Sequence, residues 1–178
     1  NSNVNLKNGF KDFTNLSKIF LNFKNKINLI NKKKFVVAVS GGPDSLALVA
    51  FTKAYTYFHK SKFFYVLVDH NIRKNSSREA NKVKNLLKNK SINLKIISNK
   101  KKIKKNIQSE ARNIRYELLT EFCLKNNIKS LITAHNLEDQ VETFLIRLSR
   151  GSGLRGLSGM SFKNKINKIN LYRPLLDT

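Results

Sequence analysis

Six consecutive residues combine small, hydroxyl and acidic side chains in an order suited to binding phosphate: Ser40-Gly41-Gly42-Pro43-Asp44-Ser45, hereafter the glycine loop. The glycines allow a tight turn and leave no Cβ in the way of a ligand. The serines supply hydroxyl donors, and Asp44 supplies a carboxylate able to hold Mg²⁺ against phosphate. A β-type apolar run (35–39) precedes the loop and an apolar helical run (46–51) follows it. Amides at the start of a helix favour anions, so this stretch predicts a nucleotide site.

The glycine loop differs from the two commonest phosphate-binding patterns. No lysine follows the glycines as G-x-x-x-x-G-K-[ST] requires, and there is no G-x-G-x-x-G. The order S-G-G-x-D-S instead resembles the pyrophosphate loop of the ATP pyrophosphatases, which split ATP between its α and β phosphates to adenylate a substrate. The simpler alternative is an ordinary strand-to-helix turn with a serine cap.

Further candidate residues follow predicted strands or share a face of a predicted helix. The apolar run 63–68 leads into Asp69 and His70, and a predicted strand at 130–134 leads into His135. Ligands of open α/β sheets bind at the carboxyl ends of strands. Arg112 and Arg115 share one face of a helix predicted at 106–126. Acidic side chains gather near the start of the helix that follows His135, where they either perform chemistry or complement the helix dipole: Glu138, Asp139 and Glu142.

The elements that would position these residues alternate along the chain. Apolar spacing predicts an amphipathic helix from residue 10 to the basic run at 32–34. It also predicts a helix from the glycine loop to about residue 58, a helix at 76–89 and a strand at 92–98. We expect an inward stripe on the helix after His135, formed by Leu137, Val141, Leu145 and Leu148. Continuous apolar strands are typical of parallel sheets covered on both faces. The expected fold class is α/β: a three-layer sandwich around a mainly parallel, Rossmann-like sheet, with residues 1–34 as a helical lead-in and 35–178 as the catalytic domain.

Composition narrows the partners. The chain has 178 residues, and 35 Lys+Arg against 11 Asp+Glu give a net charge of +24. This excess favours a polyanion such as RNA, although lysines dispersed over a solvated surface would give the same total. The single cysteine, Cys123, excludes an internal disulfide and is expected to pack as a small hydrophobe. No signal-peptide pattern and no apolar run near the ~20 residues of a membrane span are present, which predicts a cytoplasmic protein.

With these residues together, the sequence resembles the N-terminal catalytic domain of the tRNA(Ile)-lysidine synthase family, within the ATP-pyrophosphatase (PP-loop) superfamily. The resemblance runs from about residue 35 to 176. Besides the glycine loop it rests on four stretches: 68–73 (VDHNIR), 106–116 (NIQSEARNIRY), 134–160 (AHNLEDQVETFLIRLSRGSGLRGLSGM) and 173–176 (RPLL).

The resemblance implies a ligase that joins free L-lysine to C2 of the wobble cytidine of tRNA(Ile) with a CAU anticodon, using ATP and Mg²⁺. It implies that the glycine loop holds pyrophosphate, with Asp44 on Mg²⁺. Val68, Asp69 and His70 would lie at the adenosine. Arg112 and Arg115 would neutralise phosphate charge, with Arg112 favoured, while Asp139 and Glu142 are candidates for the lysine amine. His135, Glu138 and a glycine-rich basic loop would lie at the lysine or the tRNA: Arg150, Gly151, Gly153 and Arg155.

Two departures from the family pattern matter. Glu138-Asp139 stands where the family usually has two aspartates, and the family generally continues beyond residues 173–176, so its C-terminal tRNA-binding region is expected to be absent here. A homodimer is also expected. Rival interpretations are another PP-loop pyrophosphatase, such as a tRNA thiolase or an NAD or GMP synthetase, and a truncated noncatalytic RNA-binding remnant. Sulfur transfer to tRNA normally needs paired cysteines, which a chain with one cysteine does not have.

Overall fold

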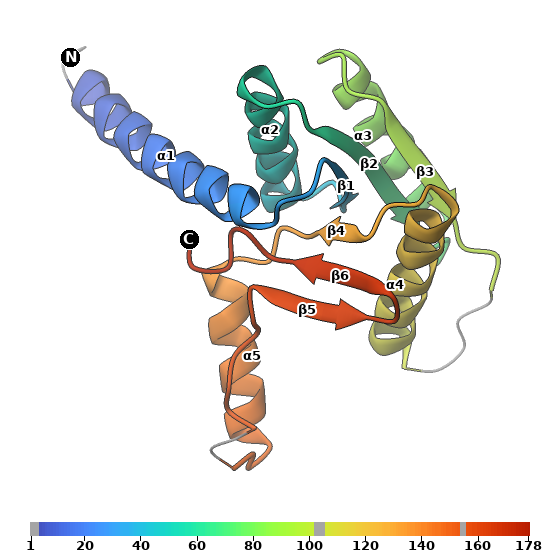
Figure 1. Ribbon diagram of the computed structural model, residues 1–178. Helices are drawn as coiled ribbons and strands as arrows, with labels where there is room; N and C mark the ends of the chain where they lie inside the picture. The colour runs from blue at the N-terminus through green and yellow to red at the C-terminus, as the bar shows by residue number, and fades with distance from the viewer. Residues whose placement is uncertain (1–3, 102–105, 154–155) are drawn as a thin grey trace.

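One six-stranded sheet, in the order β3-β2-β1-β4-β6-β5, forms the centre of the molecule. A computed structural model describes residues 4–101, 106–153 and 156–178, with side chains from residue 14 onward. The elements in chain order are α1 (Val4–Leu29), β1 (Lys34–Val39), α2 (Pro43–Phe58), β2 (Lys62–Asp69), α3 (Ser76–Lys88), β3 (Leu94–Ser98), α4 (Ile107–Lys125), β4 (Ser130–Ile132), α5 (Leu137–Ser149), β5 (Lys163–Ile166) and β6 (Ile169–Tyr172). All neighbouring strands pair in parallel except β5, which is antiparallel to β6 (Figure 1).

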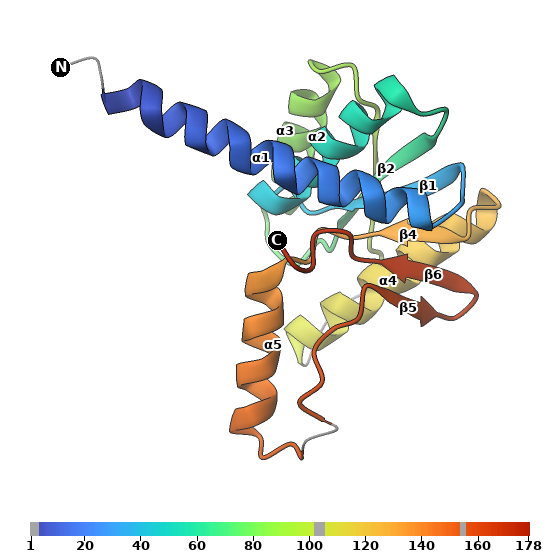
Figure 2. The same ribbon diagram turned by 60° about the vertical axis from the view of Figure 1, so that its left-hand side comes forward.

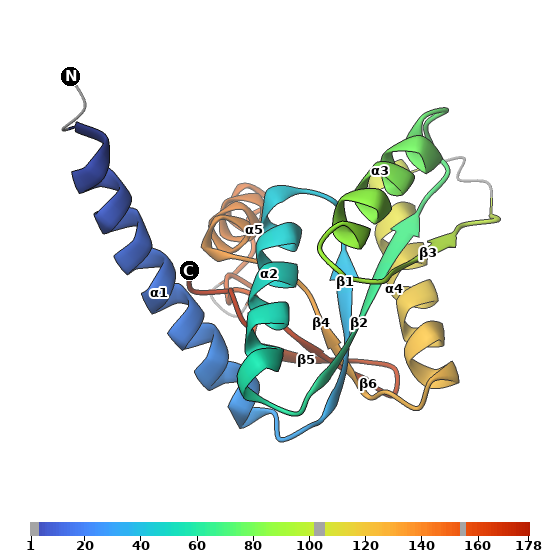
Figure 3. The ribbon, with the colours of Figure 1, turned by 90° about the horizontal axis from the view of Figure 1, so that it is seen from above.

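Alternate residues of the central strands divide the core into two layers. On β1, Phe35, Val37 and Val39 pack in the cluster shared with α1, α2 and α3. Val36, between them in sequence, belongs to the opposite cluster, which includes Leu119 and Cys123 of α4. Figure 3 shows α2 and α3 on one side of the sheet and α4 on the other. The predicted three-layer α/β sandwich is confirmed, and Cys123 is fully buried as a small apolar residue.

Helix α1 contacts the rest of the molecule through its carboxyl-terminal half. Phe23 is fully buried, and its ring lies 5.6 Å from that of Phe51 on α2. Lys26 forms an ion pair with Asp177, which joins the helix to the last turn of the chain. The amino-terminal half extends away from the sheet (Figure 2). The helix starts at Val4, before the residue 10 expected from apolar spacing.

The expected inward stripe on α5 is wrong. Side chains of Leu137, Val141, Leu145 and Leu148 are between 51% and 55% exposed. The reason is that α5 runs away from the sheet rather than along it (Figures 1 and 2), so no core lies beneath that face. Its other side is attached to the segment after residue 156, where the Gln140 amide and the Met160 backbone exchange hydrogen bonds.

The carboxyl-terminal hairpin extends the sheet beyond β4. The apolar residues of 169–172 predict a strand, and β6 pairs there in parallel with β4. β5 is a Lys- and Asn-rich outer strand whose sequence has no strand pattern, and it was not expected. Within the described ranges, no helix is both long and apolar enough to cross a membrane.

Candidate active site

The candidate site lies where the carboxyl ends of β1, β2 and β4 meet. β1 pairs in parallel with both neighbours, so the chain reverses its direction of sheet growth at β1. That reversal point is where open α/β sheets bind ligands. A cavity of about 270 Å³ occupies it, with walls from the glycine loop, the end of β2, helix α4 and residues 133–139. Four segments distant in sequence are therefore brought to one place.

Ser45 holds the glycine loop in shape. Its hydroxyl accepts a hydrogen bond from the Gly41 N–H at 3.0 Å and donates to the Gly42 carbonyl at 2.9 Å, and its side chain is 4% exposed. Gly41 has φ +89°, and a Cβ there would lie 2.8 Å from Cγ2 of Val83 on α3. Pro43 opens α2 and Asp44 lies in its first turn. The first amides of a helix have no partner within it, so this end of α2 faces the cavity with unpaired donors.

Asp69 is fixed inside the protein rather than displayed to a ligand. It is 4% exposed, and its carboxylate accepts from the Ser77 hydroxyl at 2.6 Å and the Asn71 N–H at 3.0 Å. Burial raises its pKa, but these hydrogen bonds outweigh that effect and leave the pKa below its ordinary value. Asp69 thus shapes the turn after β2, while Val68 and His70 line the cavity itself.

The two arginines of α4 are held differently. Arg115 lines the cavity, and its Nε donates to Nε2 of His70 at 3.4 Å. The guanidinium of Arg112 lies 5.4 Å from the centre of the Tyr116 ring, in a cation–π contact. The resemblance favoured Arg112 for phosphate, but the structure brings Arg115 and not Arg112 to the same cavity as Ser40 and Asp44.

His135 and Asp139 complete the wall formed by the segment after β4. Nδ1 of His135 lies 2.8 Å from the Thr133 hydroxyl. Burial, followed by the charge of Arg173, lowers the pKa of His135 to about 4, against the opposing effect of Asp139. The imidazole is therefore neutral at physiological pH. Asp139 lines the same cavity while one of its oxygens, Oδ2, accepts from the Asn136 N–H at 2.9 Å.

Other predicted site residues lie apart from this cavity. Glu138 and Glu142 border a separate hollow beside Leu137, Val141 and Thr178. Arg150, Gly151 and Gly153 follow the carboxyl end of α5, which Figure 1 shows far from the sheet. Arg155 lies outside the described residues. The structure thus brings Asp139 to the glycine loop but leaves the two glutamates on an outer face of the same helix.

Arg173 is a residue near the site to which sequence reasoning assigned no role. It follows β6, is 4% exposed, and donates from Nη1 to the Ser161 carbonyl at 2.9 Å. Its Nε is buried without a partner among the described residues. Its signals in the sequence are its place in the 173–176 (RPLL) stretch of the family resemblance and the use of Arg in a Lys-rich chain.

The residues fit a magnesium nucleotide better than a metal held by protein alone. Within the described part of the chain, no group of three or more His, Cys, Asp and Glu side chains could hold a metal ion. Mg²⁺ is commonly bound by one or two carboxylates together with substrate phosphates. Asp44 is exposed beside the loop amides. Mg²⁺ would therefore be held here by this one carboxylate together with the phosphates of the nucleotide.

A family model described as a PP-loop domain matches residues 14–178, which include every element from β1 to β6. The chain belongs to the PP-loop domain family. The match also places most of α1 inside the family region. The glycine loop is therefore the PP-loop of this chain, and the resemblance recognised in the sequence is confirmed.

Two curated relatives share a name. tRNA(Ile)-lysidine synthase of Wolbachia pipientis wMel is 42% identical over 158 residues, covering 84% of this chain and 37% of the relative. The chloroplastic tRNA(Ile)-lysidine synthase of Gracilaria tenuistipitata var. liui is 37% identical over 153 residues, covering 84% of this chain and 47% of the relative. This PP-loop chain thus spans less than half the length of either relative.

Solved structures support the fold. The U34-tRNA thiolase NcsA from Methanococcus maripaludis superposes with a TM-score of 0.73 over 90% of this chain and 59% of its own, at 18% identity. At that identity the likeness extends to the PP-loop fold alone.

Proposed function

We propose that this PP-loop domain carries out the ATP-dependent steps of a tRNA(Ile)-lysidine synthase. In this reaction ATP adenylates the C2 oxygen of the wobble cytidine in tRNA(Ile) with a CAU anticodon, and pyrophosphate leaves. The ε-amine of free L-lysine then attacks C2 and displaces AMP. Two observations support the proposal. The curated relatives bear this name, and the PP-loop, Arg115 and Asp139 line one cavity.

In the adenylation step the loop and the arginine act on the phosphates. The amides at the start of α2 and the hydroxyl of Ser40 bind the pyrophosphate part of ATP, while Ser45 holds the loop in the shape that this binding needs. Asp44 would hold the Mg²⁺ of a bound magnesium nucleotide, and that ion would supply positive charge to the phosphates. Arg115 stabilises the negative charge that develops between the α and β phosphates, and Arg112 supports it from the next turn of α4. Val68 and His70 border the space for the adenosine.

In the second step a carboxylate must bind the lysine ammonium and accept a proton from it. Free lysine has a pKa of about 10.4, so its ammonium has to lose a proton before it attacks. Asp139 is the acid nearest this chemistry because it shares the cavity with the PP-loop. Glu142 lies three residues further on, but it borders the separate hollow on the outer face of α5 and not this cavity. Asp139 therefore first pairs with the ammonium as lysine approaches and then receives its proton.

The positive charge of the chain suits a tRNA. A net charge of +24 attracts a phosphate backbone, and the loop with Arg150, Gly151 and Gly153 offers donors at the tip of α5. We infer that this loop contacts the tRNA backbone away from the cavity.

One observation carries the proposal: Asp139 and Arg115 line the same cavity as Ser40 and Asp44 of the PP-loop. The test is release of AMP and pyrophosphate from ATP with tRNA(Ile) bearing CAU, with lysine present, omitted or replaced by arginine. AMP release that needs both this tRNA and lysine is expected, and Asp44→Ala should abolish it. Glu121→Gln, an exposed change on α4, is the matched control and should leave the rate unchanged.

Other outcomes separate the rival functions. AMP formation with a different nucleophile would assign the domain to another PP-loop reaction. RNA binding with a steep salt dependence and no AMP would contradict catalysis by these 178 residues and indicate an RNA-binding role.

A further inference from the structure

His70 and Arg115 meet although they are separated by 45 positions in the sequence. Nε of Arg115 donates to Nε2 of His70 at 3.4 Å, across the cavity from the end of β2 to α4. A ring nitrogen that accepts carries no proton, so the proton of the neutral imidazole is on Nδ1. An arginine anchored through Nε keeps both terminal NH₂ groups, which form the fork that binds an oxyanion.

The second nitrogen of His70 has no partner. Nδ1 is buried and makes no hydrogen bond among the described residues. In the tautomer that the Arg115 contact requires, this atom is an N–H donor, and leaving a buried donor unpaired costs about 1–3 kcal/mol. The ring borders the nucleotide cavity, so an acceptor atom of a bound nucleotide can satisfy this donor.

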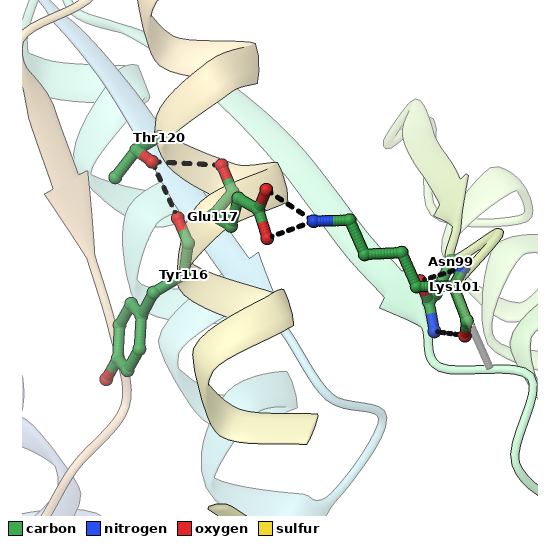
Figure 4. Close-up of polar contacts among 5 residues, drawn as sticks. All are labelled: Asn99, Lys101, Tyr116, Glu117 and Thr120. Atoms are coloured by element: carbon green, nitrogen blue, oxygen red, sulfur yellow. Dashed lines mark hydrogen bonds and ion pairs between the residues drawn. The ribbon is translucent and has the colours of Figure 1, made fainter. Parts of the chain in front are cut away.

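A clasp formed by Asn99, Lys101 and Glu117 fixes both partners of this contact. The Asn99 amide donates to the His70 carbonyl at 3.3 Å and to the Lys101 carbonyl at 2.7 Å. Lys101 reaches α4, where its Nζ donates to both carboxylate oxygens of Glu117 at 2.6 and 2.8 Å (Figure 4). An exposed ion pair of this kind contributes only about 0–1 kcal/mol. Its effect is therefore geometric: it ties α4 to the backbone that carries His70.

We propose that His70 is a positioning residue, which orients the Arg115 guanidinium toward the phosphates through Nε2 and donates from Nδ1 to the bound nucleotide. The proposal deepens the proposed function and rests on it for the identity of the nucleotide. It also distinguishes the two arginines, because Arg112 is oriented by the Tyr116 ring and not by His70. The His70 imidazole would thus contact both the bound nucleotide and Arg115, the arginine that acts on the phosphates.

The first test measures the tautomer directly. Nitrogen-15 NMR of the ligand-free protein should find the His70 proton on Nδ1, the less common tautomer of free histidine. Burial, followed by the charge of Arg115, lowers the pKa of His70 against the opposing effect of Asp69, so Arg115→Met should raise this pKa. A proton on Nε2, or a His70 pKa that does not change in Arg115→Met, would overturn the proposal. Neither measurement depends on catalysis, so a failure here is distinct from a failure of the proposed function.

Two amide substitutions separate the two nitrogens. In His70→Gln the amide oxygen reaches the position of Nε2 and can still accept from Arg115, whereas His70→Asn places an N–H donor near Nδ1 but cannot reach Arg115. His70→Gln should weaken binding of Mg²⁺ and a non-hydrolysable ATP analogue about tenfold and leave kcat within about twofold. His70→Asn should instead lower kcat about tenfold and leave binding of the nucleotide analogue within about twofold. Equal losses in both variants, matching His70→Ala, would mean that the ring only packs, and the proposal would fail.

Discussion

Asp139 and Asn136 hold each other at the start of α5. The Asp139 carboxylate accepts from the Asn136 N–H at 2.9 Å, and the Asn136 side chain accepts from the Asp139 N–H at 3.1 Å. This reciprocal pair is a capping box. It means that the two interpretations of Asp139 are compatible: one carboxylate oxygen stabilises the helix, and the other remains for the cavity.

The capping box allows the charge of Asp139 to be separated from its helix contact. Asp139→Asn keeps an oxygen that can accept from Asn136, so unfolding free energy should change by less than about 0.5 kcal/mol while AMP formation falls at least about a hundredfold. Asp139→Ala should lose the activity and in addition about 1 kcal/mol of stability. Urea unfolding and the AMP assay, run on both variants, check this. An active Asp139→Asn protein would remove Asp139 from the proton transfer.

Ser45 should matter for stability as well as for ATP. Ser45→Ala removes the acceptor of the Gly41 N–H and the donor to the Gly42 carbonyl at a position that is only 4% exposed, so it should cost about 1–3 kcal/mol. Ser40→Ala is the matched control, because Ser40 is exposed and accepts only a 3.4 Å contact from Gly42. Thermal unfolding and nucleotide titration measure the two effects. Equal stability losses in both variants would contradict the role given to Ser45.

Gly41 is under two separate constraints. Gly41→Ala forces a Cβ against Val83 and places alanine at a positive φ, which costs about 1–2 kcal/mol by itself. The double variant Gly41→Ala/Val83→Ala removes the clash but not the backbone cost. It should therefore be less destabilised relative to Val83→Ala than Gly41→Ala is relative to the original protein. A double-mutant cycle from chemical unfolding checks this, and strict additivity would show that the clash relaxes freely.

Stability should depend on pH through His135. Its pKa is about 4 in the folded protein against an ordinary 6.5, so between these values the unfolded chain binds more protons than the folded one. Stability is therefore fully present above pH 6.5 and is lost as the pH falls toward 4, by an amount on the order of 3 kcal/mol. His135→Gln cannot titrate and should flatten this part of the profile, with a residual slope of the same sign from His70. Unfolding midpoints at several pH values measure it, and unchanged slopes in the variant would contradict it.

Local patterns predicted the centre of the fold and the PP-loop well. The apolar runs that became β1 and β2 are continuous because both faces are covered, and a glycine-rich turn between a strand and a helix is visible without tertiary information. The carboxyl ends of parallel strands must meet at one edge, which is why His70 and His135 were expected beside the loop.

Other features depended on packing that the sequence does not contain. Leu137 and Val141 mark an apolar stripe, but periodicity cannot state whether anything covers it, and here nothing in the described residues does. Arg112 and Arg115 share one helix face, so only their contacts with Tyr116 and His70 distinguish them. Arg173 reads as a surface residue by type, yet the turn after β6 buries it.

The outermost strand has a consequence for how these molecules behave at high concentration. An unpaired strand edge is a template on which another chain can add a strand. On β5, Lys163 and Lys165 are exposed, and the strand is only four residues long. A second molecule approaching edge to edge would bring its own lysines against these before any backbone hydrogen bond forms. This edge of the sheet is therefore short and charged, and it resists edge-to-edge pairing with the sheet of a second molecule.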